Sequence, residues 1–378
     1  MSRTRWILLA ILVATLPFAL SQSCTPAPPT PDGNGNSDGN GSSNGNGNGG
    51  TVDPAAAQTL AAFDELWTTF DRNYSYFNHK GIDWNDVRTR YRPNFNQALT
   101  PAAFAERVAE MLQELHDWHV WVQAPGQDAL GYEGTVTTNF PPTLMASYTH
   151  DGSDYQNLAN VIYHAWLDDN IAYIAIDTFS GGAWQSITDD DIESLFDTYA
   201  LADGLIIDIR NNNGGSEINA RRIASHLALS DVTYGFTRDK VADTTDHEAF
   251  NDPISHDLEP SSGTLYLGPV ACLIGQRCMS SAEWFTLMMR GVGATLVGDQ
   301  TRGASGNPRD YTIASNGVQY GLSTWIAYTA DNDEIGFAIE DVGVTPDVPI
   351  QPGQGSGASY DDRHDFVLEA AIEELLQP

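Results

Sequence analysis

Apolar residues between positions 55 and 115 repeat at the spacing of an α-helix. The first predicted helix, from Ala55 to about Tyr76, has apolar side chains on one face: Leu60, Phe63, Leu66, Trp67 and Phe70. A second helix is predicted over residues 83–95, with Asp83 as its N-cap, and a third over residues 100–115. Thr100 is a good N-cap for the third helix, and Pro101 suits its first turn. Three helices in succession predict a small N-terminal bundle within residues 54–122.

The pattern changes after residue 122, where short apolar runs begin to alternate with helical segments. Strands are predicted at 119–124, 142–149, 160–167, 171–179, 204–210, 264–275 and 294–299. Helices are predicted at 189–201, 217–229 and 281–292. Strands that alternate with helices are typical of an α/β fold with a mostly parallel sheet. We therefore expect an α/β domain over residues 123–378.

The N-terminal segment has the layout of a secretory signal. Arg3 and Arg5 precede an apolar run from Trp6 to Leu20, which is short for a membrane span. Residues 1–23 are thus predicted to be a signal peptide, and the protein is expected to be exported.

Two endings of this signal fit the sequence. Ser21 and Ser23 satisfy the small-x-small rule for cleavage just before Cys24. Alternatively, Cys24 is lipidated as in a bacterial lipoprotein, although Leu20 lies one position earlier than the usual leucine. Residues 24–53 are rich in Gly and Asn and predict a flexible tether. A tether favours the lipid anchor, which would be the chain's one link to a membrane; without the anchor, the protein would be secreted.

The formal net charge of −32 narrows the possible partners. A polyanion such as nucleic acid would be repelled, so nucleic-acid binding is not expected. Cys272 and Cys278 are the only cysteines besides Cys24. In an oxidising compartment they could form a disulfide, and the sequence leaves that question open.

Two strand-to-helix turns carry candidate chemistry. In "GLIIDIRNNNGGSE", Gly214 and Gly215 can adopt backbone angles that point N–H groups at an anion, or they simply form a tight turn. In "CMSSAEWF", Ser280 and Ser281 follow a buried strand and precede a helix. Either serine could cap that helix. A serine at this place could also be a nucleophile, with the next backbone N–H stabilising an oxyanion.

A serine nucleophile needs a base, and the base is commonly a lysine or a histidine. The two lysines, Lys80 and Lys240, are not on elements expected to be buried, which argues against a Ser–Lys pair. His116 and His119 lie where the bundle meets the α/β domain, a common position for a site. Their i, i+3 spacing also suits a metal, but no ligand framework accompanies them. No metal and no cofactor are expected.

Six segments, in order, resemble the C-terminal processing and tricorn-core class of serine peptidases. They are "LQELHDWHVWV", "IAYIAIDTFSG", "GLIIDIRNNNGG", "GPVACLIGQRCMSSAEWF", "VGDQTRGASG" and "IEDVGVTPDVPI". The resemblance covers nearly all of residues 63–349. It implies a crotonase/ClpP-like α/β catalytic domain and peptide or protein substrates.

The resemblance assigns roles to individual residues. Ser280 takes the place of the family nucleophile, three positions before Glu283 of the "SxxE" motif. Ser281 N–H and either Gly214 or Gly215 N–H would form the oxyanion hole. Ala304 stands where the Ser–Lys branch carries its lysine, so the histidine-containing branch fits better, with His119 as base and Glu340 in support.

Two departures from the family pattern keep a second function open. Trp118 replaces the serine that precedes the catalytic histidine of the tricorn enzyme, and too few residues separate Val122 from Ile171 for a PDZ domain beside the strands. In size the chain is similar to relatives that bind retinoids. The alternative is therefore a non-catalytic module that binds a small apolar ligand. Cleavage specificity, endopeptidase against carboxypeptidase action, and oligomeric state are not determined by the sequence.

Overall fold

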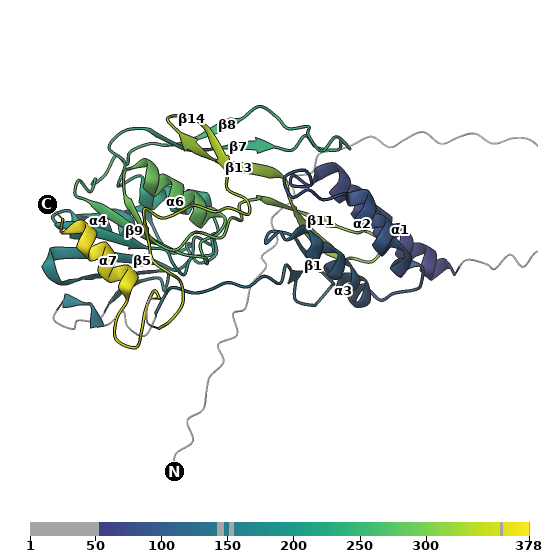
Figure 1. The fold of residues 1–378 in the computed structure, drawn as a ribbon, viewed down its shortest axis with the longest axis horizontal. Helices are drawn as coiled ribbons and strands as arrows, with labels where there is room; N and C mark the ends of the chain where they lie inside the picture. Colours follow the sequence, from purple (N-terminus) through teal and green to yellow (C-terminus); the bar gives the residue numbers. More distant parts are fainter. Residues whose placement is uncertain (1–52, 142–146, 151–154, 356–357, 378) are drawn as a thin grey trace, which may run out of the picture. The chain divides into compact units, whose positions relative to one another are not determined.

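The computed structural model describes residues 53–141, 147–150, 155–355 and 358–377 (Figure 1). The predicted signal peptide, Cys24 and nearly all of the tether lie outside the described residues and stay predictions. The strand predicted at 142–149 also lies mostly outside them. None of the helices in the described ranges has the length and apolarity needed to cross a membrane.

The N-terminal helices form where the apolar periodicity predicts them. They are α1 (Pro54–Asn73), α2 (Trp84–Tyr91) and α3 (Pro101–Leu112), and two short 3₁₀ turns, η1 (Arg92–Phe95) and η2 (Gln113–Leu115), follow α2 and α3. Both predicted N-caps are confirmed: Asp83 accepts hydrogen bonds from the backbone N–H groups of Asn85 and Asp86, and Thr100 accepts one from that of Ala103.

The apolar faces of these helices pack against a small antiparallel sheet. Its strand order is β11 (Pro308–Thr312), β12 (Gln319–Ser323), β1 (Trp121–Gln123) and β2 (Leu130–Gly131). Tyr320 and Leu322 of β12 belong to the same hydrophobic cluster as Phe63 and Phe70 of α1. The core of the helical region therefore contains side chains from a strand more than 200 residues further along the chain.

The central sheet has seven strands and is mostly parallel, as predicted. Its order is β15 (Val348–Pro349), β10 (Thr295–Gly298), β9 (Val270–Ile274), β6 (Gly204–Asp208), β5 (Ile171–Ile176), β4 (Ile162–Trp166) and β3 (Gln156–Leu158). The pairs from β15 to β5 are parallel, while β4 and β3 add antiparallel strands at one edge. All residues of β5 and β6 are buried, as expected for strands covered on both faces.

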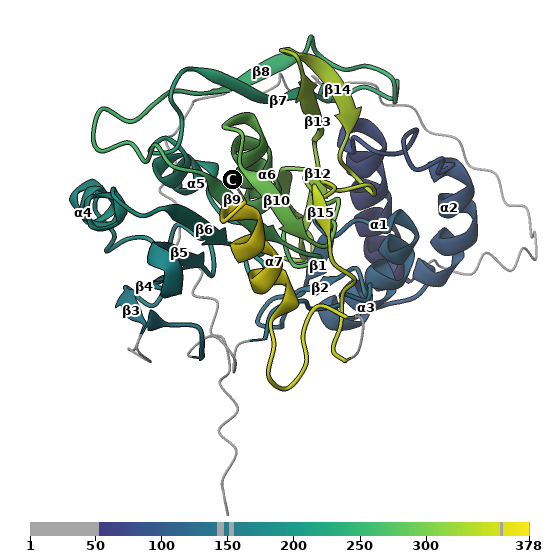
Figure 2. The same cartoon turned by 60° about the vertical axis from the view of Figure 1, so that its left-hand side comes forward.

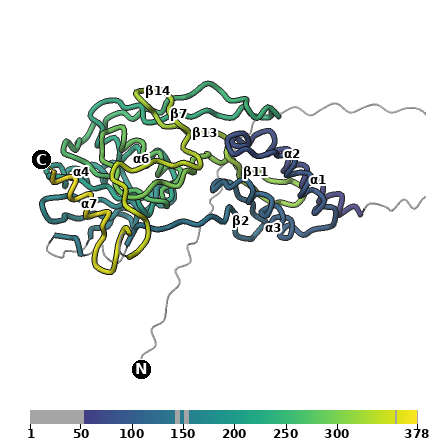
Figure 3. Tube along the Cα trace, in the orientation of Figure 1, coloured from purple at the N-terminus to yellow at the C-terminus, as the bar shows by residue number. Residues whose placement is uncertain are grey.

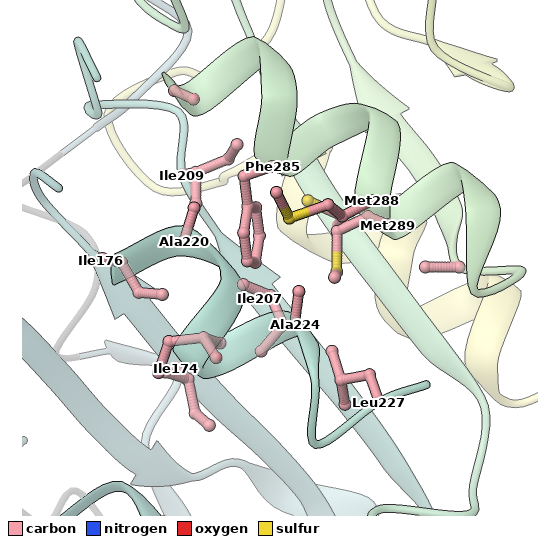
Figure 4. Close-up of a cluster of buried hydrophobic side chains, with 14 of the residues drawn as sticks. Ile174, Ile176, Ile207, Ile209, Ala220, Ala224, Leu227, Phe285, Met288 and Met289 are labelled. Carbon is pink, nitrogen blue, oxygen red and sulfur yellow. The ribbon is translucent and has the colours of Figure 1, made fainter. Parts of the chain in front are cut away.

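Alternate residues of these strands face two different helix layers. Ile174 and Ile207 are on the face covered by α4 (Asp189–Tyr199), α5 (Glu217–Ala224) and α6 (Ser281–Gly291), in one hydrophobic cluster with Phe285 and Met288 of α6 (Figure 4). Tyr173 and Ile206 are in a second cluster with Val367 and Leu368 of α7 (Phe366–Leu375), which lies on the opposite face (Figure 2). This alternation follows from the two-residue period of a strand.

A third sheet, which the sequence analysis missed, lies beyond α6 (Figure 3). Its order is β14 (Glu334–Ala338), β13 (Trp325–Asp331), β7 (Val232–Asp239) and β8 (Ile254–Leu258), and all its pairs are antiparallel. The strand β7, "VTYGFTRD", mixes polar and apolar residues and contains a glycine. Such a run lacks the continuous apolar signal by which the parallel strands were found.

A buried ion cluster fixes α7 to the central sheet. The Arg210 guanidinium is fully buried and donates to Asp208 at 2.6 Å and to Asp365 at 2.9 Å. Asp365 is also the N-cap of α7, where it accepts from Leu368 N–H at 3.1 Å. Asp208 is the last residue of β6, the strand that leads to the turn with Gly214 and Gly215 (the glycine turn). The cluster therefore joins β6 to the C-terminal helix α7.

Replacing Arg210 by Met should lower the free energy of unfolding by about 3–5 kcal/mol, because two buried carboxylates would lose their cation. Urea unfolding of Arg210→Met and of the exposed control Arg72→Met measures the difference. The control should change by less than about 0.5 kcal/mol. A loss near the control value for Arg210→Met would show that the cluster does not stabilise the fold.

Candidate active site

Ser280 lies at the turn between β9 and α6 and has an unusual backbone. Its φ and ψ are 56° and −127°, in a region that non-glycine residues rarely adopt. It occupies the N-cap position of α6, but its side chain makes no capping hydrogen bond. The alternative that the Ser280 side chain caps the helix is therefore wrong, because its hydroxyl accepts no hydrogen bond from the first turn of α6.

The glycine turn presses directly against Ser280. A Cβ atom on Gly214 would lie 2.8 Å from Ser280 Cβ and 2.6 Å from the Met279 carbonyl oxygen. The φ of Gly214 is +98°, which a side chain would also disfavour. Both the space and the backbone angle thus require glycine, and the turn after β6 is brought against the turn after β9.

Two backbone N–H groups at this contact are candidates for binding an oxyanion. Ser281 is the first residue of α6, so its N–H has no acceptor within the helix. The Gly214 N–H donates to Asn212 Oδ1 at 2.8 Å and is therefore occupied. Within the described part of the chain, the Gly215 N–H has no such partner. Of the two glycines, Gly215 is the better candidate.

The Ser281 hydroxyl has a contact that the sequence did not reveal. It is buried and donates to the Gly215 carbonyl oxygen at 2.6 Å. The Ser281 side chain therefore holds the glycine turn against α6, while its backbone N–H remains available to an oxyanion. Sequence spacing could not show this contact, because the two residues are 66 positions apart.

The loop after β10, residues 301–306, is held by one buried carboxylate. Glu283 is fully buried in the first turn of α6. It accepts hydrogen bonds from Thr301 Oγ1 at 2.7 Å, Gly303 N at 2.6 Å, Ala304 N at 2.8 Å and Ser305 Oγ at 2.8 Å. Burial raises the pKa of Glu283, and these four donors oppose that rise. The loop is thus fixed directly to the helix that follows Ser280.

This loop contacts all three predicted catalytic residues in succession. The Ala304 carbonyl accepts from Ser280 N–H at 2.7 Å, Ser305 N–H donates to Glu340 Oε2 at 3.2 Å, and Gly306 N–H donates to His119 Nδ1 at 3.4 Å. Among the described residues, no hydrogen bond joins Ser280 to His119 directly, or His119 to Glu340. The three are brought together by the loop backbone.

Asp117 fixes the backbone of the His119 segment. Its Oδ1 accepts from His119 N–H at 2.8 Å, and its Oδ2 accepts from Tyr74 at 3.0 Å and Ser323 at 2.8 Å. Burial lowers the pKa of the His119 ring, Asp117 opposes that shift, and Arg302 adds to it. The ring is therefore neutral at pH 7 and able to accept a proton.

Glu340 is buried next to a lysine. Lys80 Nζ lies 3.1 Å from Glu340 Oε1 and 2.6 Å from Asp341 Oδ1, and the Lys80 side chain is 5% exposed. Lys240 is buried as well, and donates to the carbonyl oxygens of Val241 and Asp246. The expectation that neither lysine is buried was wrong. Each is buried because its ammonium group finds oxygen partners that the local sequence does not indicate.

The remaining candidates have other surroundings. His116 has a left-handed backbone with φ of 48° and packs against Tyr132 rather than His119. In the described ranges, no group of three or more His, Cys, Asp or Glu residues is arranged to hold a metal. Cys272 and Cys278 are both buried and free, which answers the open question of a disulfide.

Trp118 is part of the wall of a polar pocket beside the site. The Arg302 guanidinium lies 4.4 Å above its ring, and both residues line the pocket with Gln276, Asp299 and Asp341. The described residues between β1 and β5 form the short strands β2, β3 and β4 and the 3₁₀ turn η5 (Asp168–Asn170), and no PDZ domain is found among them.

Two family models match parts of the chain. The family model for peptidase family S41 matches residues 170–350, and that for the tricorn protease C1 domain matches residues 56–113. A search of curated protein sequences gave no match.

Solved structures are similar over most of the chain. A candidate peptidase from Parabacteroides merdae has 27% identity and a TM-score of 0.70, covering 84% of this chain and 96% of its own. Mature CPAF complexed with lactacystin has 13% identity and a TM-score of 0.60, covering 85% and 97%. The tricorn protease has 16% identity and a TM-score of 0.51, covering 85% of this chain and 37% of its own. The region of residues 170–350 belongs to peptidase family S41, and the protein is a serine-type peptidase.

Proposed function

We propose that this protein hydrolyses peptide bonds with Ser280 as the nucleophile and His119 as the general base. Ser280 Oγ attacks the carbonyl carbon of the peptide, and its proton passes to the His119 ring. The C–N bond then breaks as the departing amine takes that proton. Water then attacks the acyl carbon while the His119 ring takes its proton, and the ester bond breaks as Ser280 Oγ takes that proton back and the carboxylic acid leaves.

The single observation that supports this proposal is the loop of residues 304–306. Its backbone contacts Ser280, Glu340 and His119 through consecutive residues. These three residues are widely separated in sequence, and helix packing alone would not require them to meet. The strained backbone of Ser280, worth about 1–3 kcal/mol, also suits a nucleophile and has no evident use in a non-catalytic module.

The N–H groups of Ser281 and Gly215 are proposed to stabilise the negative oxygen of the tetrahedral intermediate. One such donor is typically worth about 2.7–4 kcal/mol of barrier. The dipole of α6 adds positive potential at its N-terminus, where Ser281 begins the helix.

The proton on His119 must be on the correct nitrogen for this reaction. A neutral ring that accepts from Gly306 at Nδ1 carries its proton on Nε2. If Nε2 is the base, the proton must lie on Nδ1 and the Gly306 contact must be given up. At 3.4 Å that contact is weak, so its loss costs little. We propose that Glu340 favours this rearrangement by stabilising the positive ring that forms.

Replacing Ser280 by Ala should abolish both the cleavage of a peptide library and labelling by a fluorophosphonate, because the attacking oxygen is gone. Ser281→Ala should still label, but about 2- to 10-fold more slowly, since the bond to the Gly215 carbonyl is lost. Labelling rates of the two variants, with circular dichroism to check folding, measure the contrast. A wild-type protein that neither labels nor cleaves would overturn the proposal.

The labelling rate should stay constant from pH 7 to below 6.5 and fall only at lower pH. The ring must be neutral to act as a base, and burial lowers the pKa of His119 below its usual 6.5. In the unfolded chain the His119 ring has its usual pKa of 6.5, so it binds a proton at a higher pH than it does in the folded protein. Protonation of His119 therefore favours unfolding as the pH drops below 6.5. Stopped-time labelling across pH 4.5–8 would be compared with the exposed-histidine control His364→Ala. A fall in rate that begins above pH 6.5 would be inconsistent with His119 as the base.

Replacing Gly214 by Ala should lower the labelling rate about 100-fold, because the new Cβ would push Ser280 out of position. Gly293→Ala is a matched control: its φ is also positive, at +84°, but its Cβ would meet open space. Alanine is strained at a positive φ in both variants, but only Gly214→Ala displaces the nucleophile. Equal labelling rates for the two would contradict the predicted contact.

A further inference from the structure

The turn that follows α1 places Lys80 next to Glu340. Residues 76–81 form this turn, with Lys80 N–H bonded to the Tyr76 carbonyl at 2.8 Å and Gly81 N–H to that of Asn78 at 3.2 Å. Ser75 N–H bonds to the Ser323 carbonyl at 3.1 Å and anchors the turn to β12. His79 lies beside Lys80, and its Nε2 is 3.2 Å from the Glu340 carbonyl oxygen. This turn of the helical region therefore contacts residues 340–341 through the side chains of His79 and Lys80.

The charges around the Glu340 carboxylate are unbalanced without Lys80. The titratable groups that face it are Asp117, Asp341, His79, Lys80, Tyr74 and Tyr76. Burial raises the pKa of Glu340 well above its usual value, Asp117 and Asp341 raise it further, and Lys80 is the cation that opposes this rise. Glu340 Oε1 has no hydrogen-bond partner in the described part of the chain and faces Lys80 across 3.1 Å as an ion pair.

Lys80 is not itself suited to be the base. Burial alone would lower its pKa, but the carboxylates of Glu340 and Asp341 outweigh burial and raise it. The ammonium group is thus protonated at pH 7, and its shortest contact, at 2.6 Å, is to Asp341. A protonated lysine in this position cannot take the proton of Ser280, but it can stabilise a buried negative charge.

We propose that Lys80 is a positioning residue of the active site, which holds Glu340 as a carboxylate against the Ser305–Gly306 backbone that contacts His119. This inference rests on the proposed function, because it assigns Lys80 a part in the same reaction. Glu340 Oε2 accepts from Ser305 N–H, and the next N–H contacts the His119 ring. A neutral Glu340 would bind Ser305 less strongly and would not stabilise a positive ring.

The test compares four proteins: wild type, Lys80→Met, Lys80→Arg and Lys240→Met. Met keeps the aliphatic length of lysine and removes its charge. Lys240 is the matched control, since it is the chain's other lysine and is also buried, with its ammonium group on carbonyl oxygens of the loop after β7. The rate of fluorophosphonate labelling is measured from pH 6 to pH 10, with urea unfolding to confirm that each variant is folded.

Lys80→Met should label slowly at pH 7 and regain rate as the pH rises and Glu340 ionises again. Each unit by which the pKa of Glu340 exceeds the pH lowers its ionised fraction about ten-fold. Lys80→Arg should recover most of the rate, and Lys240→Met should label as wild type does. A Lys80→Met protein that labels within about two-fold of wild type at pH 7 would overturn the proposal, since a lost carboxylate should cost about ten-fold or more.

A second measurement does not depend on activity. The infrared spectrum of Lys80→Met at pH 7 should contain the C=O stretch of a protonated carboxyl group, which wild type lacks and the double variant Lys80→Met/Glu340→Gln loses. Absence of that band in Lys80→Met would overturn the role of Lys80. If wild type fails to label while the band appears as expected, the proposed reaction fails and the effect of Lys80 on Glu340 stands.

Discussion

The carboxylate of Glu283 is the interaction on which the site depends. A buried carboxylate is costly unless its oxygens are well bonded. Here four donors from residues 301–305 supply those bonds, so the loop is held in one conformation. Because that loop bonds in turn to Ser280, Glu340 and His119, a single buried charge in the first turn of α6 orders the backbone around all three.

The helical region and the sheet region work as one structure at this site. The helices and the segment after them carry His119, Asp117 and Lys80, while the carboxyl ends of β6 and β9 lead to the glycine turn and to Ser280. Asp117 bonds to Tyr74 and to Ser323 of β12, so the packing of α1 reaches the histidine directly. The site is therefore sensitive to how the N-terminal helices pack, as well as to the groups that take part in the chemistry.

Particular elements show why some of the fold could be predicted. Helices such as α3 and strands such as β6 bury a regular set of apolar positions, and their periodicity is visible in the sequence. The strands β7, β8 and β11 to β14 are antiparallel and partly exposed, so their patterns are mixed and were missed. The resemblance to a peptidase family pointed to Ser280, His119 and Glu340, because the order and spacing of motif residues can be recognised even where hydrophobic periodicity is uninformative.

The sequence by itself determined the helices, the parallel strands, the family and the chain positions of the candidate catalytic residues, since these depend on local pattern and motif. Only the tertiary structure decided which polar groups are buried together. Lys80 looks exposed in its own segment, and its partner Glu340 lies 260 residues away. The same holds for the Ser281 hydroxyl on Gly215 and for the choice between Gly214 and Gly215, because a hydrogen bond between distant segments leaves no local signal.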